Sequence, residues 1–306
     1  MARRKRGRPV NGWLVLDKPA GMTSTQAVGA VRRAFDAQKA GHAGTLDPLA
    51  TGILPIALGE ATKTVPFTVD SDKVYRFTIR WGAETTTDDT EGAVTRDSAA
   101  RPTAEDIEAL LPRFTGEIMQ VPPQFSAIKV DGERAYDMAR AGEVVDLEAR
   151  PVFIEELTIL GSPSPDETML EAVCGRGTYV RSIARDLGRL LGCYGHVSML
   201  RRTRVGDFDE ECAVTIEALR AAAESGDPAQ LAQFLQPIAT ALGDLFELAV
   251  SSADAARLAR GQSVLIRGRD APILSGPAFA TCKGELVALG EIDKGELRPS
   301  RVFTFG

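Results

Sequence analysis

The most regular alternation of apolar and polar side chains lies in residues 73–81. Its apolar face consists of Tyr75, Phe77, Ile79 and Trp81. A period of two residues is typical of a β-strand with one buried face, so the pattern predicts a strand here. Shorter apolar segments predict further strands at residues 13–16 and 169–174.

Apolar residues that recur every three or four positions predict helices between these strands. One helix is expected to begin at Ser24 as its N-cap. Its buried face would hold Ala27, Val28, Val31 and Phe35. A second helix is predicted over residues 103–111, because Thr103 is followed three residues later by Asp106, the spacing of a capping box.

A third helix follows Gly177 and is expected to stop at Gly192. Its buried face is predicted to consist of Val180, Ile183, Leu187, Leu190 and Leu191. Three arginines, Arg181, Arg185 and Arg189, recur every four residues on another face. Arg181 lies in the first turn, where a cation opposes the helix dipole. We therefore expect a carboxylate beside Arg181.

The pattern changes near the C-terminus, after a helical linker at residues 228–244. A small helix is predicted from Ser252, its N-cap, to Gly261. Short strands are expected at residues 246–250, 264–266, 278–282, 286–292 and 302–305. Residues 283–285 and 293–296 have the composition of hairpin turns. Residues 245–306 are therefore predicted to form a compact, β-rich module.

Composition favours a soluble protein of one large and one small domain. The chain has 306 residues, 44% of them hydrophobic and 25% charged. It has no run of eighteen apolar residues, so no membrane partner is expected. The basic residues 1–9 are not followed by the apolar segment of a secretory signal.

Cysteine and histidine usage narrows the chemistry. The four cysteines have neither zinc-ribbon spacing nor the density of a disulfide scaffold, which favours a reducing, cytoplasmic location. The two histidines, His42 and His196, are far apart, which argues against a histidine-based metal site. Residues 88–92 are acidic but lack the alternating ligands of a calcium loop, so no metal is predicted.

The net charge of −6 hides an uneven distribution. Residues 174–206 contain seven arginines against one acid, a net charge of +6. Residues 84–118 contain nine acids against three arginines, a net charge of −6. This asymmetry favours one face that attracts phosphates and another that is merely solvated. A helix whose arginines form surface ion pairs is the alternative.

One loop is the strongest candidate for chemistry. Residues 41–52 read Gly-His-Ala-Gly-Thr-Leu-Asp-Pro-Leu-Ala-Thr-Gly and precede the apolar run 53–58. Pro48 biases Asp47 towards an extended backbone, and the flanking glycines allow a ligand to approach closely. The carboxylate of Asp47 could therefore be directed at a substrate. A simple connecting turn explains the same residues.

The loop and its continuation to Lys63 resemble the catalytic motif of the TruB family of tRNA pseudouridine synthases. Other segments match the same family in the same order. They are Asp17-Lys18-Pro19-Ala20-Gly21-Met22-Thr23-Ser24, Tyr75 on its strand, Val121-Pro122-Pro123-Gln124-Phe125-Ser126-Ala127, and Gly177-Thr178-Tyr179-Val180-Arg181-Ser182. The resemblance covers residues 10–306 and is strongest before residue 208.

This resemblance implies an α+β fold with two domains. Residues 10–244 would form the catalytic domain, a mixed, largely antiparallel sheet with flanking helices. Residues 245–306 would form a small β-rich, PUA-like RNA-binding domain. Residues 124–150 would be an insertion that contacts tRNA, although an ordinary crossover fits the same sequence. The basic tail, residues 1–9, could touch RNA or simply be a disordered, solubilising end.

The implied reaction is isomerisation of the T-loop uridine at position 55 of tRNA, which requires no cofactor. Asp47 would act as nucleophile or charge stabiliser, and Arg181 would keep it ionised. Tyr75 would stack on the flipped uracil and is a candidate for transfer of the C5 proton. As a lone residue on an apolar stripe, Tyr75 could equally belong to the core.

The resemblance also implies supporting roles for other residues. Asp89 would join the network of Asp47 and Arg181, and Tyr179 would line the pocket. His42 would hold the splayed T-loop. Lys18, Lys63 and Leu200 would shape the site or contact the RNA backbone, although Leu200 could equally be a core residue.

Two other functions are compatible with the sequence. A non-catalytic RNA-binding or RNA-folding protein would use the arginine-rich surface and the β-rich module. A synthase of the dyskerin type would require a guide RNA and protein partners, but the long basic extensions of such proteins are absent. We therefore expect a monomer that binds tRNA without a guide RNA.

Overall fold

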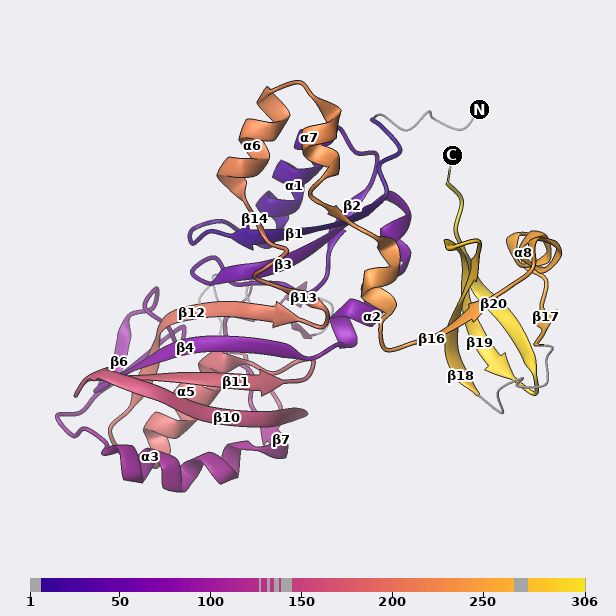
Figure 1. Ribbon diagram of the computed structural model, residues 1–306. Coiled ribbons are helices and arrows are strands. Elements are labelled where there is room, and N and C mark those ends of the chain that lie inside the picture. The colour runs from indigo at the N-terminus through magenta and orange to yellow at the C-terminus, as the bar shows by residue number, and fades with distance from the viewer. Residues whose placement is uncertain are drawn as a thin grey trace.

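The computed structural model describes residues 7–126, 128–130, 133–134, 138, 145–266 and 275–305. It contains an eleven-stranded sheet with flanking helices and a separate five-stranded sheet at the C-terminal end (Figure 1). The predicted α+β fold is confirmed. None of the described helices is long and apolar enough to cross a membrane.

The large sheet is mixed, with most neighbouring strands antiparallel. Along the sheet its main strands are β14 (Val214–Thr215), β1 (Gly12–Lys18), β3 (Thr51–Leu58), β12 (Gly195–Val205), β4 (Lys73–Trp81), β11 (Glu167–Cys174), β10 (Arg150–Ser164) and β7 (Gly116–Gln120). Short strands at its margin are β2 (Ala40–His42), β13 (Phe208–Asp209) and β15 (Leu235–Gln236). The predicted strand at residues 73–81 is confirmed as β4.

Two short hairpins lie outside the large sheet. One joins β5 (Ala83–Thr85) to β6 (Val94–Asp97), and the other joins β8 (Lys129–Val130) to β9 (Glu133–Arg134). The second hairpin falls within the predicted insertion 124–150, of which residues 127, 131–132, 135–137 and 139–144 lie outside the described residues. The first six residues of the basic tail lie outside them too.

Strand β12 joins the two halves of the large sheet. It pairs antiparallel with β4 along its whole length but parallel with β3 at only two positions, Arg201 with Thr51 and Arg202 with Gly52. A Cβ atom at Gly52 would lie 2.1 Å from the Arg202 carbonyl oxygen, so only glycine fits this contact. The sequence pattern did not reveal β12.

The helices pack on the faces and ends of the large sheet (Figure 1). They are α1 (Ser24–Ala34), α2 (Val65–Asp70), α3 (Ala104–Leu110), α5 (Val180–Leu190), α6 (Ile216–Glu224) and α7 (Pro228–Ala232), with 3-10 turns η1 (Gly59–Lys63), η2 (Leu111–Phe114) and η3 (Ile238–Leu242). The capping box of α3 at Thr103 and Asp106 is confirmed. The N-cap of α1 is Thr23 rather than Ser24, because Ser24 is turned inward against Leu46.

Helix α5 buries Val180, Ile183 and Leu187 as predicted. The prediction was wrong for Leu190, whose exposed fraction is 47%. Arg181 and Arg185 are buried instead. The reason is that a loop carrying carboxylates covers the arginine side of the helix, so that this side is a polar interior rather than a solvated surface.

The C-terminal sheet contains β16 (Phe246–Ala249), β18 (Gly276–Cys282), β19 (Glu285–Asp293), β20 (Glu296–Val302) and β17 (Val264–Leu265), with α8 (Ser252–Ala259) against it. The two predicted hairpin turns are confirmed, with positive φ at Lys283, Gly284, Lys294 and Gly295. Two details were wrong: Ser251 caps α8, and the last strand ends at Val302. Polar residues on the exposed face of β20 concealed that strand.

The C-terminal sheet is docked on the part of the chain that forms the large sheet, through an apolar cluster. Phe279, Leu289 and Phe303 share this cluster with Trp13 and Phe208. Polar contacts at its edge come from η1, where the Lys63 Nζ donates to the Val302 carbonyl at 2.7 Å and the Thr304 amide donates to Glu60 at 2.8 Å. The two sheets therefore share a buried interface.

Candidate active site

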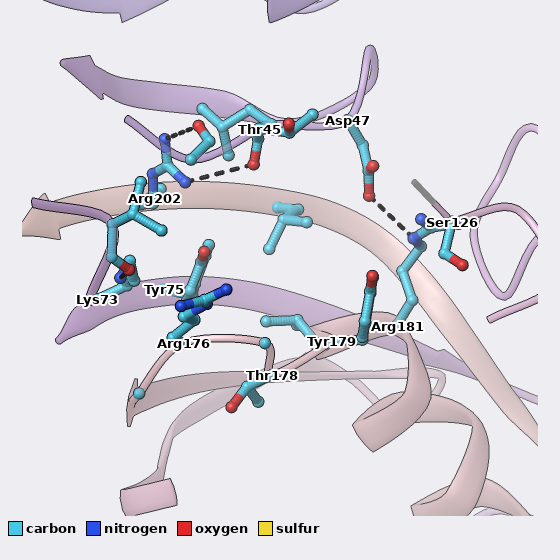
Figure 2. Close-up of a pocket in the computed structure, with 17 residues that line it drawn as sticks. Thr45, Asp47, Lys73, Tyr75, Ser126, Arg176, Thr178, Tyr179, Arg181 and Arg202 are labelled. Carbon is cyan, nitrogen blue, oxygen red and sulfur yellow. Dashed lines mark hydrogen bonds and ion pairs between the residues drawn. The ribbon is translucent and has the colours of Figure 1, made fainter. Parts of the chain in front are cut away.

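A cavity of about 250 Å³ lies beside β4 and β12, where several segments converge. Its walls come from the loop before β3, from β4 and β12, from the turn between β11 and α5, and from Ser126 (Figure 2). Asp47, Tyr75, Tyr179, Arg181 and Leu200, all predicted from the sequence, are among the residues that line it.

The loop that carries Asp47 is held by backbone contacts on both sides of the aspartate. The Ser24 hydroxyl donates to the Leu46 carbonyl at 3.0 Å and accepts from the Leu46 amide at 2.9 Å. The Pro48 carbonyl accepts from the Gly21 amide at 2.8 Å and from the Lys18 Nζ at 3.3 Å. Lys18 therefore holds the loop that carries Asp47 through a hydrogen bond to its backbone. Burial lowers the pKa of its ammonium to about 8.

Arg181 meets two carboxylates, as its position in the first turn of α5 predicted. Its Nε lies 2.9 Å from the Oδ2 of Asp47, and its Nη1 lies 3.5 Å from the Oδ2 of Asp89. The same guanidinium donates to the carbonyls of Thr87 and Phe125, each at 2.9 Å. These contacts fix the guanidinium plane, so the orientation of the Asp47 carboxylate is fixed as well.

The two carboxylates differ in exposure. The Asp89 side chain is 3% exposed and also accepts hydrogen bonds from Thr87 and from the Glu91 amide. The Asp47 side chain is 35% exposed and faces the cavity. Asp89 therefore serves as the internal counterion of Arg181, while Asp47 is accessible to a substrate.

Two tyrosines and a leucine form much of the remaining wall. Burial raises the pKa of the Tyr75 phenol, and the nearby Arg202 guanidinium partly offsets this rise. Burial also raises the pKa of Tyr179, which the neighbouring Ser126 hydroxyl partly offsets. The backbone of Tyr179 is held by Gln120, whose side chain accepts from its amide at 2.8 Å and donates to its carbonyl at 3.1 Å. Because the pKa values of Tyr75 and Tyr179 are both raised, both phenols stay protonated at neutral pH.

Arg202 was missed by the sequence reasoning as a site residue. It is 1% exposed and reaches from β12 to the loop that carries Asp47. Its guanidinium donates to the carbonyls of Ile53 at 2.8 Å, Gly44 at 3.1 Å and Thr45 at 3.4 Å. Because the sequence pattern did not reveal β12, no signal separated this arginine from its neighbours.

Comparison with known proteins identifies the family. Residues 32–180 match the model of the TruB family pseudouridylate synthase (N terminal domain). Residues 181–243 match the model of the tRNA pseudouridylate synthase B C-terminal domain. This chain belongs to the TruB family. Neither model extends over the C-terminal sheet of this TruB-family chain.

Similar proteins agree with this assignment. "tRNA pseudouridine synthase B" of Rhodopseudomonas palustris is 61% identical over 98% of this chain and 82% of its own length. The protein of the same name from Sinorhizobium medicae is 55% identical over 98% of both chains. Among solved structures, a Cbf5-Nop10-Gar1 complex contains a chain with a TM-score of 0.73 and 26% identity, covering 96% of this chain and 84% of that one.

A second solved structure, an H/ACA RNP bound to a substrate RNA containing 2'-deoxyuridine, has a TM-score of 0.74 to this TruB-family chain. The identity is 24%, over 99% of this chain and 92% of that one, so this likeness concerns the fold.

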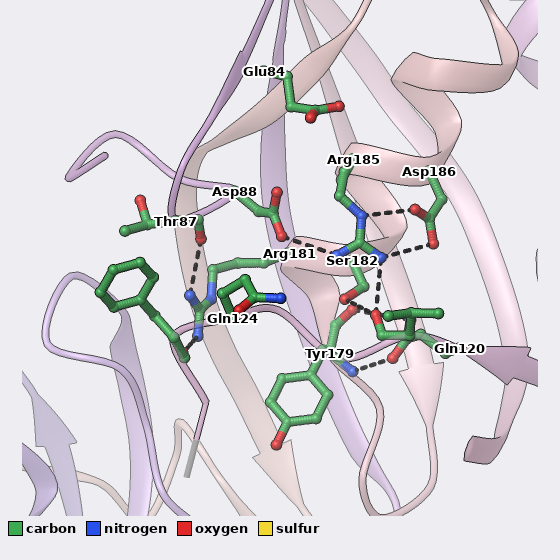
Figure 3. Close-up of polar contacts among 12 residues, drawn as sticks. Glu84, Thr87, Asp88, Gln120, Gln124, Tyr179, Arg181, Ser182, Arg185 and Asp186 are labelled. Carbon is green, nitrogen blue, oxygen red and sulfur yellow. Dashed lines mark hydrogen bonds and ion pairs between the residues drawn. The ribbon is translucent and has the colours of Figure 1, made fainter. Parts of the chain in front are cut away.

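Two arginines of the arginine-rich stretch of the TruB-family chain, Arg185 and Arg189, are engaged by carboxylates of the acidic segment. Arg185 pairs with Asp88 at 3.1 Å and with Asp186 at 2.8 Å (Figure 3). Arg189 pairs with Glu84 at 2.6 Å. The acidic segment thus folds against the basic one. The two segments neutralise each other here, as in the ion-paired alternative, but the pair of Arg185 with Asp88 is buried rather than on the surface.

Four predicted residues do not line the cavity of this TruB-family chain: Lys18, His42, Lys63 and Asp89. Lys18 and Asp89 contact the Asp47 loop and Arg181 instead, as described above. Lys63 lies at the interface with the C-terminal sheet, where it also pairs with Glu60. His42 lies on β2, and its Nδ1 is buried without a hydrogen-bond partner among the described residues. Burial lowers the pKa of the His42 imidazole. No cluster of metal-ligating side chains occurs within the described residues.

Proposed function

We propose that this protein isomerises the T-loop uridine at position 55 of tRNA to pseudouridine, with Asp47 as the catalytic nucleophile. Membership of the TruB family, with relatives named tRNA pseudouridine synthase B, makes the chain a tRNA pseudouridine synthase, an isomerase. The observation that carries the role of Asp47 is its position in the cavity, 2.9 Å from a buried arginine and beside two tyrosines.

The reaction breaks the bond between uracil N1 and ribose C1′ and forms a bond from C5 to C1′. The C5 proton leaves, and N1 gains a proton. An ionised Asp47 can attack C1′, attack C6 of the uracil, or promote a glycal intermediate, and every route begins with the same carboxylate. Arg181 keeps this carboxylate ionised and oriented, so it needs no rearrangement when the substrate arrives.

The remaining residues of the cavity would bind the uracil and transfer its C5 proton. Tyr75 would stack on the extruded uracil, and such stacking contributes roughly 1–3 kcal/mol per base. Because burial keeps its phenol protonated, Tyr75 would pass on the C5 proton through a neutral hydroxyl. Tyr179 and Leu200 would close the pocket around the base. Lys18 and Arg202 would hold the loop of Asp47.

The two domains would have the catalytic and RNA-binding roles that the family resemblance implied. Residues 10–244 would form the catalytic domain, and the β-rich residues 245–306 would form a PUA-like domain that binds tRNA. The insertion 124–150 would contact the T-arm. Action without a guide RNA is supported by the relatives named tRNA pseudouridine synthase B, whose sequences match nearly the whole chain. We further propose that the protein acts as a monomer.

The proposal is tested with an unmodified tRNA transcript that carries tritium at C5 of uridine. The purified protein alone should release one tritium per tRNA, and changing the T-loop uridine to cytidine should abolish the release. Strong, salt-dependent binding of tRNA without release would instead favour a non-catalytic RNA-binding protein. Release only after addition of a guide RNA would reject stand-alone action.

A further inference from the structure

Ser126 presents an unused hydroxyl to the cavity. The residue is 3% exposed, and its Oγ has no hydrogen-bond partner among the described residues. In Figure 2 it lies beside the Arg181 guanidinium, across from Asp47. The Ser126 hydroxyl is close enough to Tyr179 to lower the pKa of that phenol. The distance and angles between the two hydroxyls nevertheless do not meet hydrogen-bond geometry, so the Oγ is unpartnered.

Several other polar groups of the cavity are already engaged within the protein. The guanidinium of Arg181 contacts two carboxylates and two carbonyls. Arg202 donates to three carbonyls, and the Lys73 Nζ donates to the carbonyls of Val69 and Ser71. The Thr178 hydroxyl donates to Phe153. These groups shape the cavity, whereas the hydroxyl of Ser126 remains available.

A buried hydroxyl without a partner destabilises the folded protein and calls for an explanation. A second such hydroxyl, that of Thr68, lies on α2 and does not line the cavity. Ser126 differs from Thr68 because a ligand in the cavity could reach it. Uracil offers two carbonyl oxygens, O2 and O4, that a serine hydroxyl can donate to.

We propose that Ser126 donates a hydrogen bond to a carbonyl oxygen of the extruded uracil and thereby binds the target base. The inference rests on the proposed function, since it requires a uracil in this cavity. Ser126 would be a substrate-binding residue that touches the reacting base. Its hydroxyl is left unpaired in the free enzyme and becomes satisfied when the base enters.

The first test compares Ser126→Ala with Thr68→Val, which removes the other unpaired hydroxyl. We expect Ser126→Ala to lower kcat/KM for a T-arm stem-loop about three- to tenfold, the usual effect of one lost hydrogen bond. Its melting temperature should equal or exceed that of the wild type, because the free enzyme loses no contact. Thr68→Val should leave kcat/KM unchanged. A lowered melting temperature with unchanged kcat/KM would make Ser126 structural and overturn the inference.

The second test replaces the target uridine by 2-thiouridine or 4-thiouridine, since sulfur is a weaker acceptor than oxygen. One of the two thio substitutions should lower kcat/KM at least threefold less in Ser126→Ala than in the wild type. The reason is that the thio substitution and Ser126→Ala remove the same hydrogen bond. Independent effects at both positions would overturn the inference. A wild-type enzyme inactive on the unmodified stem-loop would instead reject the proposed function, so the two failures are distinguishable.

Discussion

The ion network around Arg181 explains how one carboxylate can stay reactive inside the protein. A buried guanidinium without a counterion is costly, so an arginine at this position requires a permanent acidic partner. Asp89 is such a partner, because its side chain is almost fully buried and held by other hydrogen bonds. Asp47 can therefore lose its charge by bonding to a substrate while Arg181 remains paired.

Asp88, next to this network, gives a prediction on pH. Burial raises its pKa from 3.8 to about 6, although Arg185 and Arg181 oppose the rise. Between these pH values the folded protein keeps a proton that the unfolded chain has released. Raising the pH from 4 to 6 should therefore lower the free energy of unfolding through Asp88, by about 3 kcal/mol at most.

Asp88→Asn removes this titration and provides the measurement. Urea unfolding of both proteins at several pH values should show that the variant gains stability relative to the wild type as the pH rises from 4 to 6. Taking the difference removes the contributions of the other acidic groups. A difference that stays constant across this range would contradict the raised pKa.

At the scale of single residues, the sequence predicted those whose local surroundings are unusual. Asp47 stood out because proline and glycines surround it, and Arg181 because a cation in the first helical turn requires an anion. The sequence around Arg202 and around Ser126 has no comparable local feature. Their importance comes from segments far apart in sequence that meet only in the folded chain.

Among the elements, strand β12 determines the geometry of the site. Its brief parallel pairing with β3 places Arg202 beneath the loop that carries Asp47. The contact is possible because Gly52 lets the two backbones approach closely. We regard Arg202 as a positioning residue, since it holds the loop without facing Asp47 directly.

Arg202→Lys keeps the charge but loses the planar arrangement of donors. It should lower kcat by about 10²-fold, as a small displacement of a catalytic group does, while KM changes much less. The matched control is Arg201→Lys, because Arg201 is the next residue and pairs with Asp17 and Glu210 on the other side of β12. Tritium release under saturating tRNA measures both. Equal losses of kcat in the two variants would contradict a specific role for Arg202.

The elements predicted best were those with a simple period. Strand β4, helix α3 and the two hairpin turns of the C-terminal sheet followed from local pattern alone. Strand β12 did not, in part because Arg202 is polar in sequence but buried in the fold. The same cause explains α5, whose arginine side reads as solvent-facing until the acidic loop that covers it is known.

At the scale of the whole molecule, apolar packing joins the C-terminal sheet to the large sheet. Phe303 is buried in the cluster shared with the large-sheet part of the chain. Phe305, stacked on it at 6.4 Å between ring centroids, is 46% exposed. The sequence predicted a β-rich module but could not show that it shares a core with Trp13, at the other end of the chain.

Phe303→Ala should therefore lower the free energy of unfolding by about 3–5 kcal/mol, the usual cost of removing a buried aromatic side chain. Phe305→Ala should cost less than about 1 kcal/mol, because it leaves the shared cluster intact. Urea unfolding monitored by tryptophan fluorescence would report both values. Similar effects of the two substitutions would show that the interface contributes little to stability.

Asp47→Asn tests most directly whether Asp47 performs the chemistry. The amide keeps the shape of the side chain but cannot act as an anionic nucleophile. We expect that the variant still binds tRNA, with an affinity within about tenfold of the wild type, and releases no tritium from C5-labelled tRNA above background. Tritium release at a rate near that of the wild type would contradict it.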